Sequence, residues 1–330
     1  MQRYVYFIYL AIASVTVFVY LYSEIKTRNQ FYYMYENRDE SFVKEKRTIK
    51  LQTKYPLTLQ GEYIINNKSV CRNTKKVSVL VMVHTAVEHF GTRSEMRTTW
   101  LNITRYRPEV IRVIFLVGTT LRKTSQEKLE EENALHHDII QGDFKDTYRN
   151  LTNKGVMGLR WVTENCMNAE VIVKIDDDSV INFFKFFENF SYLRKRKRFL
   201  FCHVMPRNAV RIERDKRNKW FVSDRFLKGF KLYPYTYCSG FAVFISKDLI
   251  PALYKAAMTV PFFWVDDVYL FGILPSRLKN VVYTNMARNM TINPYRALDC
   301  YRRLKSKCNY LAMQAKGVQI RNLWNLIEQE

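Results

Sequence analysis

Apolar runs separated by amphipathic segments predict an α/β body in this chain. Val77–Thr85, Arg112–Thr119 and Val171–Ile175 are nearly continuous apolar runs, as expected for strands buried on both faces of a sheet. The segments 93–101, 124–135 and 150–166 have helical patterns, and shorter strands are predicted at 138–140 and 199–204. Thr124 and Glu127 form a capping-box pattern, which predicts the start of the second helix. Strands alternating with helices predict an open sheet with a parallel core.

The N-terminal segment is uniformly apolar instead of periodic. Residues 4–22 contain no charged side chain, and a helix of this length, at about 1.5 Å per residue, spans a bilayer core of roughly 30 Å. No small-residue cleavage site ends the segment, which favours an uncleaved anchor over a signal peptide or a buried helix. The predicted organisation is a short cytoplasmic tail with a signal-anchor over 1–22, a polar stem over 23–70 and a lumenal domain over 71–330.

Charge, sequons and cysteines narrow the class of partner. The chain has 53 Lys and Arg against 31 Asp and Glu, which favours anionic partners such as nucleic acid, phosphorylated ligands, sulfated glycans or a membrane surface. Six cysteines and five N-x-[ST] sequons point to an oxidising, lumenal compartment, which argues against nucleic acid. Sequence leaves the disulfide pairing open, with Cys300 and Cys308 as the best local pair. The sequons are at Asn67, Asn102, Asn150, Asn189 and Asn289.

Three carboxylates, Asp176, Asp177 and Asp178, follow the third apolar strand. Ligands of open α/β sheets gather at the carboxyl ends of the strands. Clustered carboxylates repel one another unless a cation or hydrogen-bond donors compensate them, so the pattern favours Mg²⁺ or Mn²⁺ holding a diphosphate. Alternation along an extended segment predicts Asp178, with or without Asp176, as the metal ligand. An acidic turn without a ligand is the simpler interpretation of the same residues.

A second acidic pair, Asp266 and Asp267, follows the aromatic segment 261–264. Loss of water beside aromatic rings raises the pKa of a carboxyl group and makes it a better base near neutral pH. A helix start favoured by the macrodipole explains the pair equally well, and both interpretations can hold. His84 and His203 end apolar strands, so they are interpreted as hydrogen-bonded structural residues instead of metal ligands.

Seven ordered blocks between about residue 77 and residue 282 resemble the beta-1,3-galactosyltransferase-like family. Members of this family are Golgi type II membrane enzymes that transfer a hexose from a UDP-sugar. The blocks are Arg93-x-x-x-Arg97-x-x-Trp100, Phe115–Gly118, Asp143 to Lys154 with the pattern D-F-x-D-x-Y-x-N-L-T-x-K, Lys174-x-Asp176-Asp177-Asp178, Lys219-Trp220-x-Val222-Ser223, Tyr233-Pro234 leading to Cys238-Ser239-Gly240, and Asp266-Asp267-Val268-Tyr269-x-x-Gly272.

This resemblance implies a GT-A fold, with a Rossmann-like nucleotide-sugar half joined to an acceptor half. It implies inverting transfer of galactose or N-acetylglucosamine, in beta-1,3 linkage, to a glycan on a glycoprotein, glycolipid or proteoglycan in the Golgi lumen. Mn²⁺ or Mg²⁺ would assist the reaction. The resemblance assigns Arg93, Arg97, Asp176 and Asp177 to the nucleotide, Asp178 and Asp176 to the metal, Asp267 to the base, and Trp220, Tyr233, Tyr237 and Asp266 to the acceptor.

Two alternatives remain open at this point. In some relatives a histidine downstream of the base completes the metal shell, whereas all five histidines of this chain precede Asp267. An inactive relative that acts as a chaperone or glycan-binding partner is therefore one alternative hypothesis. The other is a metal-dependent phosphotransferase or nuclease, which would act on phosphodiesters without a preference for UDP.

Overall fold

The computed structural model describes residues 62–72 and 74–329 of the 330. The predicted tail and anchor (1–22) and most of the predicted stem lie outside these residues. Within the described residues, no helix has both the length and the apolar character needed to cross a bilayer.

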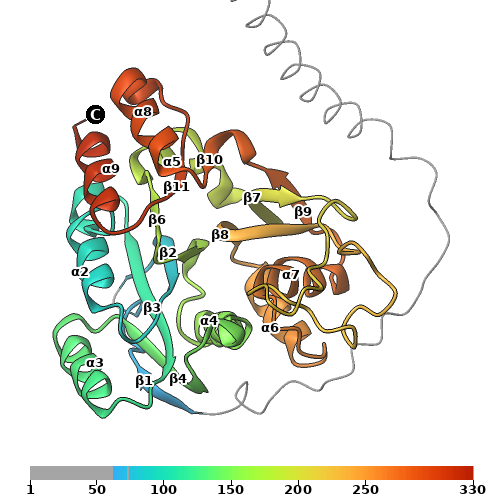
Figure 1. Ribbon diagram of the computed structural model, residues 1–330. Coiled ribbons are helices and arrows are strands. Elements are labelled where there is room, and N and C mark those ends of the chain that lie inside the picture. Colours follow the sequence, from blue (N-terminus) through green and yellow to red (C-terminus); the bar gives the residue numbers. More distant parts are fainter. Residues whose placement is uncertain (1–61, 73, 330) are drawn as a thin grey trace, which may run out of the picture. The chain divides into compact units, whose positions relative to one another are not determined.

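The described residues form an alternating α/β chain (Figure 1). The strands are β1 (Tyr63–Asn66), β2 (Val77–His84), β3 (Ile111–Thr119), β4 (Ile139–Lys145), β5 (Ala169–Asp176), β6 (Ser179–Ile181), β7 (Phe199–Met205), β8 (Tyr237–Ser246), β9 (Val282–Asn285), β10 (Met290–Thr291) and β11 (Ala312–Gln314). The α-helices are α2 (Phe90–Thr98), α3 (Lys123–His136), α4 (Leu151–Asn165), α5 (Phe183–Asn189), α6 (Leu249–Ala257), α7 (Asp266–Val268), α8 (Pro294–Leu304) and α9 (Val318–Glu328).

Eight strands form one mixed sheet in the order β1-β4-β3-β2-β5-β8-β7-β9. The four adjacent strands β4, β3, β2 and β5 are parallel to one another, which confirms the predicted parallel core. β8 pairs antiparallel with both β5 and β7, and β1 pairs antiparallel with β4. A second sheet, β10-β11-β6, joins the C-terminal segment to the residues that follow β5. The C-terminal segment therefore reaches the same sheet edge as the Asp176–Asp178 motif.

Three predicted boundaries are wrong. The compact domain begins before residue 71, because β1 already belongs to the large sheet. The strand predicted at 138–140 continues to Lys145. The helix α3 starts at Lys123, with Arg122 at its N-cap and no side-chain capping bond, so the Thr124–Glu127 capping box does not form.

The central strand β2 is buried along its whole length. Val79, Val81 and Val83 belong to a large apolar core shared with residues of α2, α8 and α9. On α4, which packs against β2 and β3, Gly158 provides the space for close approach. A Cβ atom at Gly158 would stand 2.6 Å from Leu116 Cδ1. The small residue therefore sets the spacing between helix and sheet.

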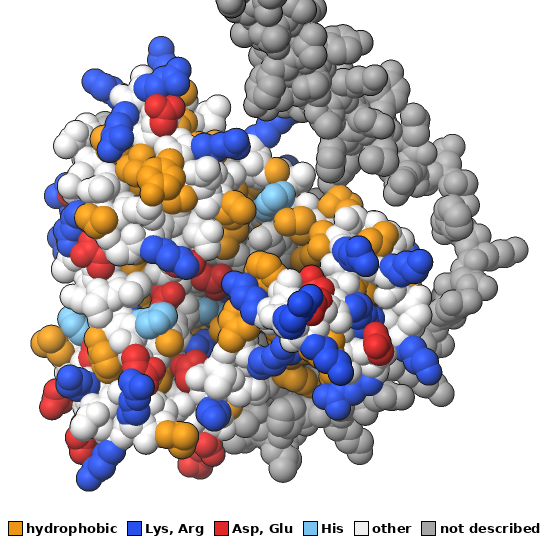
Figure 2. All heavy atoms as spheres, viewed as in Figure 1, with side chains coloured by type: hydrophobic (Ala, Val, Ile, Leu, Met, Phe, Trp, Pro, Cys, Tyr) orange, Lys and Arg blue, Asp and Glu red, His pale blue; other side chains and the backbone are white. Residues whose placement is uncertain are grey.

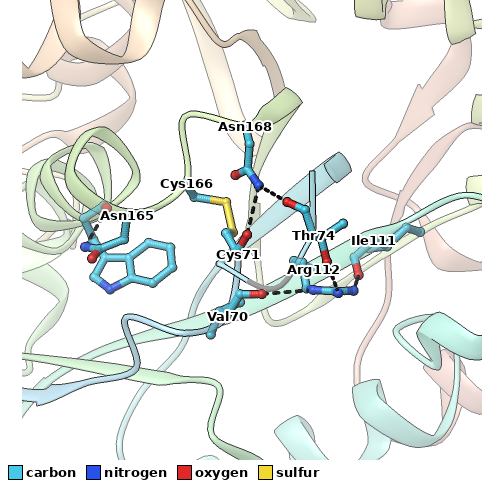
Figure 3. Close-up of a disulfide and its surroundings, with 9 residues drawn as sticks. Val70, Cys71, Thr74, Ile111, Arg112, Asn165, Cys166 and Asn168 are labelled. Atoms are coloured by element: carbon cyan, nitrogen blue, oxygen red, sulfur yellow. Dashed lines mark hydrogen bonds between the residues drawn. A yellow bond between two sulfur atoms is a disulfide. The ribbon is translucent and has the colours of Figure 1, made fainter. Parts of the chain in front are cut away.

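The described chain contains three disulfides, one local and two that link more distant parts. Cys300–Cys308 is confirmed as the predicted local pair. Cys71–Cys166 joins the segment after β1 to the end of α4, and beside it Asn168 Nδ2 donates to the carbonyl oxygens of Cys71 and Thr74 (Figure 3). Cys202–Cys238 joins β7 to β8 and so closes the long excursion between these strands. Closing such loops reduces the conformational freedom of the unfolded chain.

Candidate active site

The three predicted carboxylates lie where β5 turns into β6, and each has a basic partner. Asp176 Oδ1 accepts a hydrogen bond from Lys174 Nζ at 2.7 Å. Asp177 Oδ2 contacts His89 Nδ1 at 2.7 Å and accepts from Thr85 Oγ1 at 2.6 Å, which ties the turn to the segment after β2. Although the site gathers negative charge, protein cations and donors compensate much of it.

Asp178 is held by residues that the sequence did not single out. Gln314 Nε2 donates to Asp178 Oδ2 at 3.0 Å, and Lys316 Nζ lies 3.3 Å from the same oxygen. The backbone N–H of Ala315 donates to the Asp178 carbonyl at 2.8 Å. The sequence signal here was two polar residues, Gln314 and Lys316, on either side of Ala315. This pattern is too common in loops to indicate a site.

One carboxylate oxygen of Asp178 is suited to bind a divalent ion. Asp178 Oδ1 is buried and has no hydrogen-bond partner, and an unpaired buried carboxylate oxygen is costly unless a cation compensates it. Asp176, whose side chain is 37% exposed, would supply a second carboxylate. Among the described residues, no group of three or more His, Cys, Asp or Glu side chains is arranged to hold a metal. The remaining ligands would therefore come from water and the diphosphate.

Lys174 brings the two acidic motifs together. Its ammonium, 1% exposed, lies 2.7 Å from Asp176 Oδ1 and 3.8 Å from Asp266 Oδ2. It also donates to the carbonyl of Gly240 on β8 at 2.6 Å. Burial disfavours the charged lysine, but attraction by Asp176, Asp266 and Asp267 outweighs it and raises the pKa of Lys174. The motifs therefore share one cation, although their nearest members, Asp178 and Asp266, are 88 positions apart in sequence.

Asp267 lies against β8 at Gly240. A Cβ atom at Gly240 would stand 1.7 Å from Asp267 Oδ1, so only glycine leaves room for this carboxylate. Burial and then repulsion by Asp266 raise the pKa of Asp267 well above its ordinary value. A carboxyl group with a raised pKa is a stronger proton acceptor once it is ionised.

Arg93 and Arg97, assigned to the nucleotide by resemblance, are committed to protein partners. Arg93 is fully buried and donates to the carbonyls of Ala86 and Val87 as well as to Glu132. Arg97 pairs with Glu132 at 2.6 Å and with Asp138 at 2.8 Å. Arg93 thus supports the backbone of the segment after β2, and the assignment of both arginines to the nucleotide stays a prediction.

Buried charges also lie beneath the site. Lys154 Nζ pairs with Asp146 Oδ1 at 2.7 Å and donates to the Thr85 carbonyl. His84, at the end of β2, is buried as expected, but neither ring nitrogen has a hydrogen-bond partner among the described residues. Burial, followed by repulsion from Lys174 and Lys154, lowers the pKa of His84. The imidazole is therefore neutral, and the expectation of a hydrogen-bonded histidine is wrong.

An exposed aromatic surface adjoins the site. Trp220 and Tyr148 are 50% and 47% exposed, and Trp220 Nε1 donates to the Tyr148 hydroxyl at 2.7 Å. Lys219 Nζ lies 4.4 Å from the centre of the Trp220 ring system. Tyr233 and Tyr237 are each only 6% exposed, so of the three aromatic acceptor candidates only Trp220 presents a free surface. Sequence reasoning missed Tyr148 as its partner.

Basic side chains surround this part of the molecule. Figure 2 shows Lys and Arg gathered on the region formed by the segment between β7 and β8, which is yellow in Figure 1. Residues 206–236 of that segment contain more basic than acidic side chains. The surface near Trp220 therefore attracts anions more than cations.

Comparison with known proteins identifies the family. A family model described as galactosyltransferase matches residues 91–286. The chain is 31% identical over 216 residues to beta-1,3-galactosyltransferase 1 of Homo sapiens, covering 63% of each chain. It is 30% identical over 275 residues to lactosylceramide 1,3-N-acetyl-beta-D-glucosaminyltransferase of Mus musculus, covering 78% of this chain and 69% of the relative.

Solved structures also match, at low sequence identity. A glycosyltransferase involved in glycosylation of the PBCV-1 major capsid covers 77% of this chain and all of its own, with 9% identity and a TM-score of 0.38. The galactosyltransferase LgtC covers 76% of this chain and 95% of its own, with 10% identity and a TM-score of 0.37. The family model, which matches more than half of the chain, carries the assignment: the chain belongs to the galactosyltransferase family.

Proposed function

We propose that the protein is an inverting hexosyltransferase with a GT-A fold. It moves galactose or N-acetylglucosamine from a UDP-sugar to a glycan hydroxyl, in beta-1,3 linkage. The observation that carries the proposal is Lys174, whose buried ammonium lies between Asp176 and Asp266 and so unites the two acidic motifs. A donor-binding carboxylate group and a candidate base must lie in one site for a displacement reaction, and these contacts support that arrangement.

Each side of the site has its own task in this mechanism. Asp267 takes the proton of the acceptor hydroxyl as that oxygen attacks the anomeric carbon from the face opposite the phosphate, which inverts the configuration. Asp178 and Asp176 would hold Mn²⁺ or Mg²⁺, which as a Lewis acid stabilises charge on the departing UDP. Burial raises the pKa values of Asp176 and Asp267, and the positive charge of Lys174 acts against that shift while it holds the two acidic motifs close together. Asp177 holds the turn to the segment after β2 through Thr85 and His89.

The exposed aromatic surface is the proposed acceptor platform. Sugars present C–H faces that pack on aromatic rings, and Trp220 with Tyr148 offers such a surface, close enough to Asp266 and Asp267 for their charges to add to burial in raising the pKa of Tyr148. We expect Trp220→Ala to raise the KM for the acceptor about tenfold or more, since a well-packed interfacial aromatic contributes about 2 kcal/mol. The KM for the UDP-sugar should stay within about twofold. Initial rates measured against both substrates test this, and an unchanged acceptor KM would remove Trp220 from the platform.

The compartment proposed is the Golgi lumen, with the predicted segment 4–22 as the membrane anchor. Three disulfides support an oxidising compartment. Among the sequons, Asn189 is exposed and its amide nitrogen donates to the neighbouring exposed carboxylate of Glu188, whereas Asn102 Oδ1 accepts from its own sequon hydroxyl, Thr104. The amide nitrogens at the other three sequons donate to protein carbonyl oxygens, at Asn67, Asn150 and Asn289. Glycosylation is therefore proposed at Asn102 and Asn189.

A donor screen tests the proposal directly. Purified protein is given a panel of UDP-sugars with Mn²⁺ and an acceptor panel from glycoproteins, glycolipids and proteoglycans. We expect transfer from UDP-galactose or UDP-N-acetylglucosamine. UDP binding without transfer or hydrolysis would favour the inactive relative, and cleavage of phosphodiesters without UDP preference would favour the phosphotransferase or nuclease.

A further inference from the structure

Lys316 is an exposed cation aimed at the carboxylate motif that follows β5. Its side chain is 74% exposed, and its ammonium lies 3.3 Å from Asp178 Oδ2. The residue stands between β11 and α9, outside the region 91–286 that matches the family. Three contacts hold its neighbourhood in place: the Ala315 and Gln314 bonds to Asp178, and the bond from the Lys316 backbone N–H to Gln319 Oε1 at 3.2 Å.

The four buried or paired cations around the two acidic motifs have little charge to offer a ligand. Lys174 and Lys154 are 1% and 2% exposed and are bound to carboxylate and carbonyl oxygens. Arg93 and Arg97 are bound to Glu132, and Arg97 also to Asp138. Lys316 differs because 74% of its side chain is exposed, so solvent and a ligand can reach the donors of its ammonium. A solvent-exposed ion pair is weak, so a ligand with several negative oxygens can compete for the ammonium.

The two oxygens of Asp178 have different surroundings. Oδ2 is contacted by Gln314 and Lys316, whereas Oδ1 is buried without a partner. One carboxylate can therefore hold the lysine through one oxygen and a divalent ion through the other. A diphosphate bound beside Asp178 would then meet two sources of positive charge, and one of them belongs to the chain itself.

This inference rests on the proposed function. We propose that Lys316 binds the diphosphate of the UDP-sugar and shares the charge-neutralising role of the metal. UDP therefore binds with reduced but measurable affinity when divalent ions are removed. Gln314 is a positioning residue, because it acts through Asp178. The ligand class is a nucleoside diphosphate, and the contact made by Lys316 is with the phosphate oxygens.

The experiment is a calorimetric titration of the purified protein with UDP and with uridine, each in Mn²⁺ and in EDTA. The variants are Lys316→Gln, Lys316→Arg and the control Lys123→Gln. Lys123 is a fitting control because it is also an exposed lysine paired with a carboxylate, Glu127 at 3.7 Å, but on α3. Melting temperatures verify that each variant is folded.

We expect the unmodified protein to bind UDP in EDTA and Lys316→Gln to weaken that binding about tenfold, the size of one charge-assisted contact. Lys316→Arg should bind within about threefold of the unmodified protein, and Lys123→Gln and uridine binding should be unchanged. If Lys316→Gln weakened uridine binding as much as UDP binding, the role of Lys316 would be structural and the proposal would be overturned. Unchanged UDP binding in Lys316→Gln, or UDP binding that vanishes in EDTA, would also overturn it. No UDP binding under any condition would overturn the proposed function itself.

Discussion

Replacing Asp267 with asparagine is expected to reduce sugar transfer by about 10²- to 10⁴-fold, the usual contribution of a general base. The amide has nearly the same shape as the carboxyl group, so UDP affinity should stay within about twofold. The variant should be at least as stable as the unmodified protein. Because burial and Asp266 raise the pKa of Asp267 in the folded state, its ionised form opposes folding above the unfolded pKa, and asparagine removes that charge.

Transfer rates, UDP titration and thermal unfolding test these three expectations together. Asp299→Asn on α8 is the control, since it makes the same chemical change at a side chain that is 62% exposed. A transfer rate close to that of the unmodified protein would show that another group accepts the proton.

The pH dependence of the unmodified protein provides a second test of the same residue. The base must be ionised, so activity is lost as pH falls through its pKa. The raised pKa of Asp267 predicts that this loss begins nearer neutrality than for an ordinary aspartate, whose pKa is about 3.9. A kcat/KM profile that stays flat down to about pH 4 would contradict the assignment.

Replacing Lys154 with methionine is expected to lower the free energy of unfolding by about 3–5 kcal/mol. The Lys154–Asp146 pair is almost fully withdrawn from water, with 2% and 8% of the side chains exposed. Methionine fills similar space but leaves Asp146 charged and unpaired. Asp146 Oδ2 also accepts from the backbone N–H of Gly118 at 2.9 Å, so its displacement would disturb β3 as well.

Urea unfolding measures the loss, with Lys123→Met as the matched control. The Lys123–Glu127 pair is exposed, so the control should change stability by at most about 1 kcal/mol. The double variant Lys154→Met with Asp146→Asn should recover part of the loss, because it removes the uncompensated charge. A loss below about 1 kcal/mol in Lys154→Met would mean that water or another cation reaches Asp146.

Local patterns predicted much of the fold. The buried strands β2, β3 and β5 were predictable because burial on both faces requires continuous apolar runs. The Thr124–Glu127 capping-box pattern did not predict the start of α3 correctly, because the helix begins at Lys123 without a side-chain cap. Conversely, the antiparallel pairing of β8 beside β5 depends on contacts between strands far apart in sequence, and no local pattern encodes it.

The sequence alone determined the residue types of the candidate site: carboxylates after a buried strand, a second acidic pair beside aromatics, and a tryptophan in a recognisable block. Only the tertiary structure decided how their charges are balanced. It joined the acidic motifs through Lys174, withdrew Arg93 into the interior and brought Lys316 to Asp178. The physical reason is that electrostatic partners are chosen by distance in space and by exclusion of water, and neither quantity is set by separation along the chain.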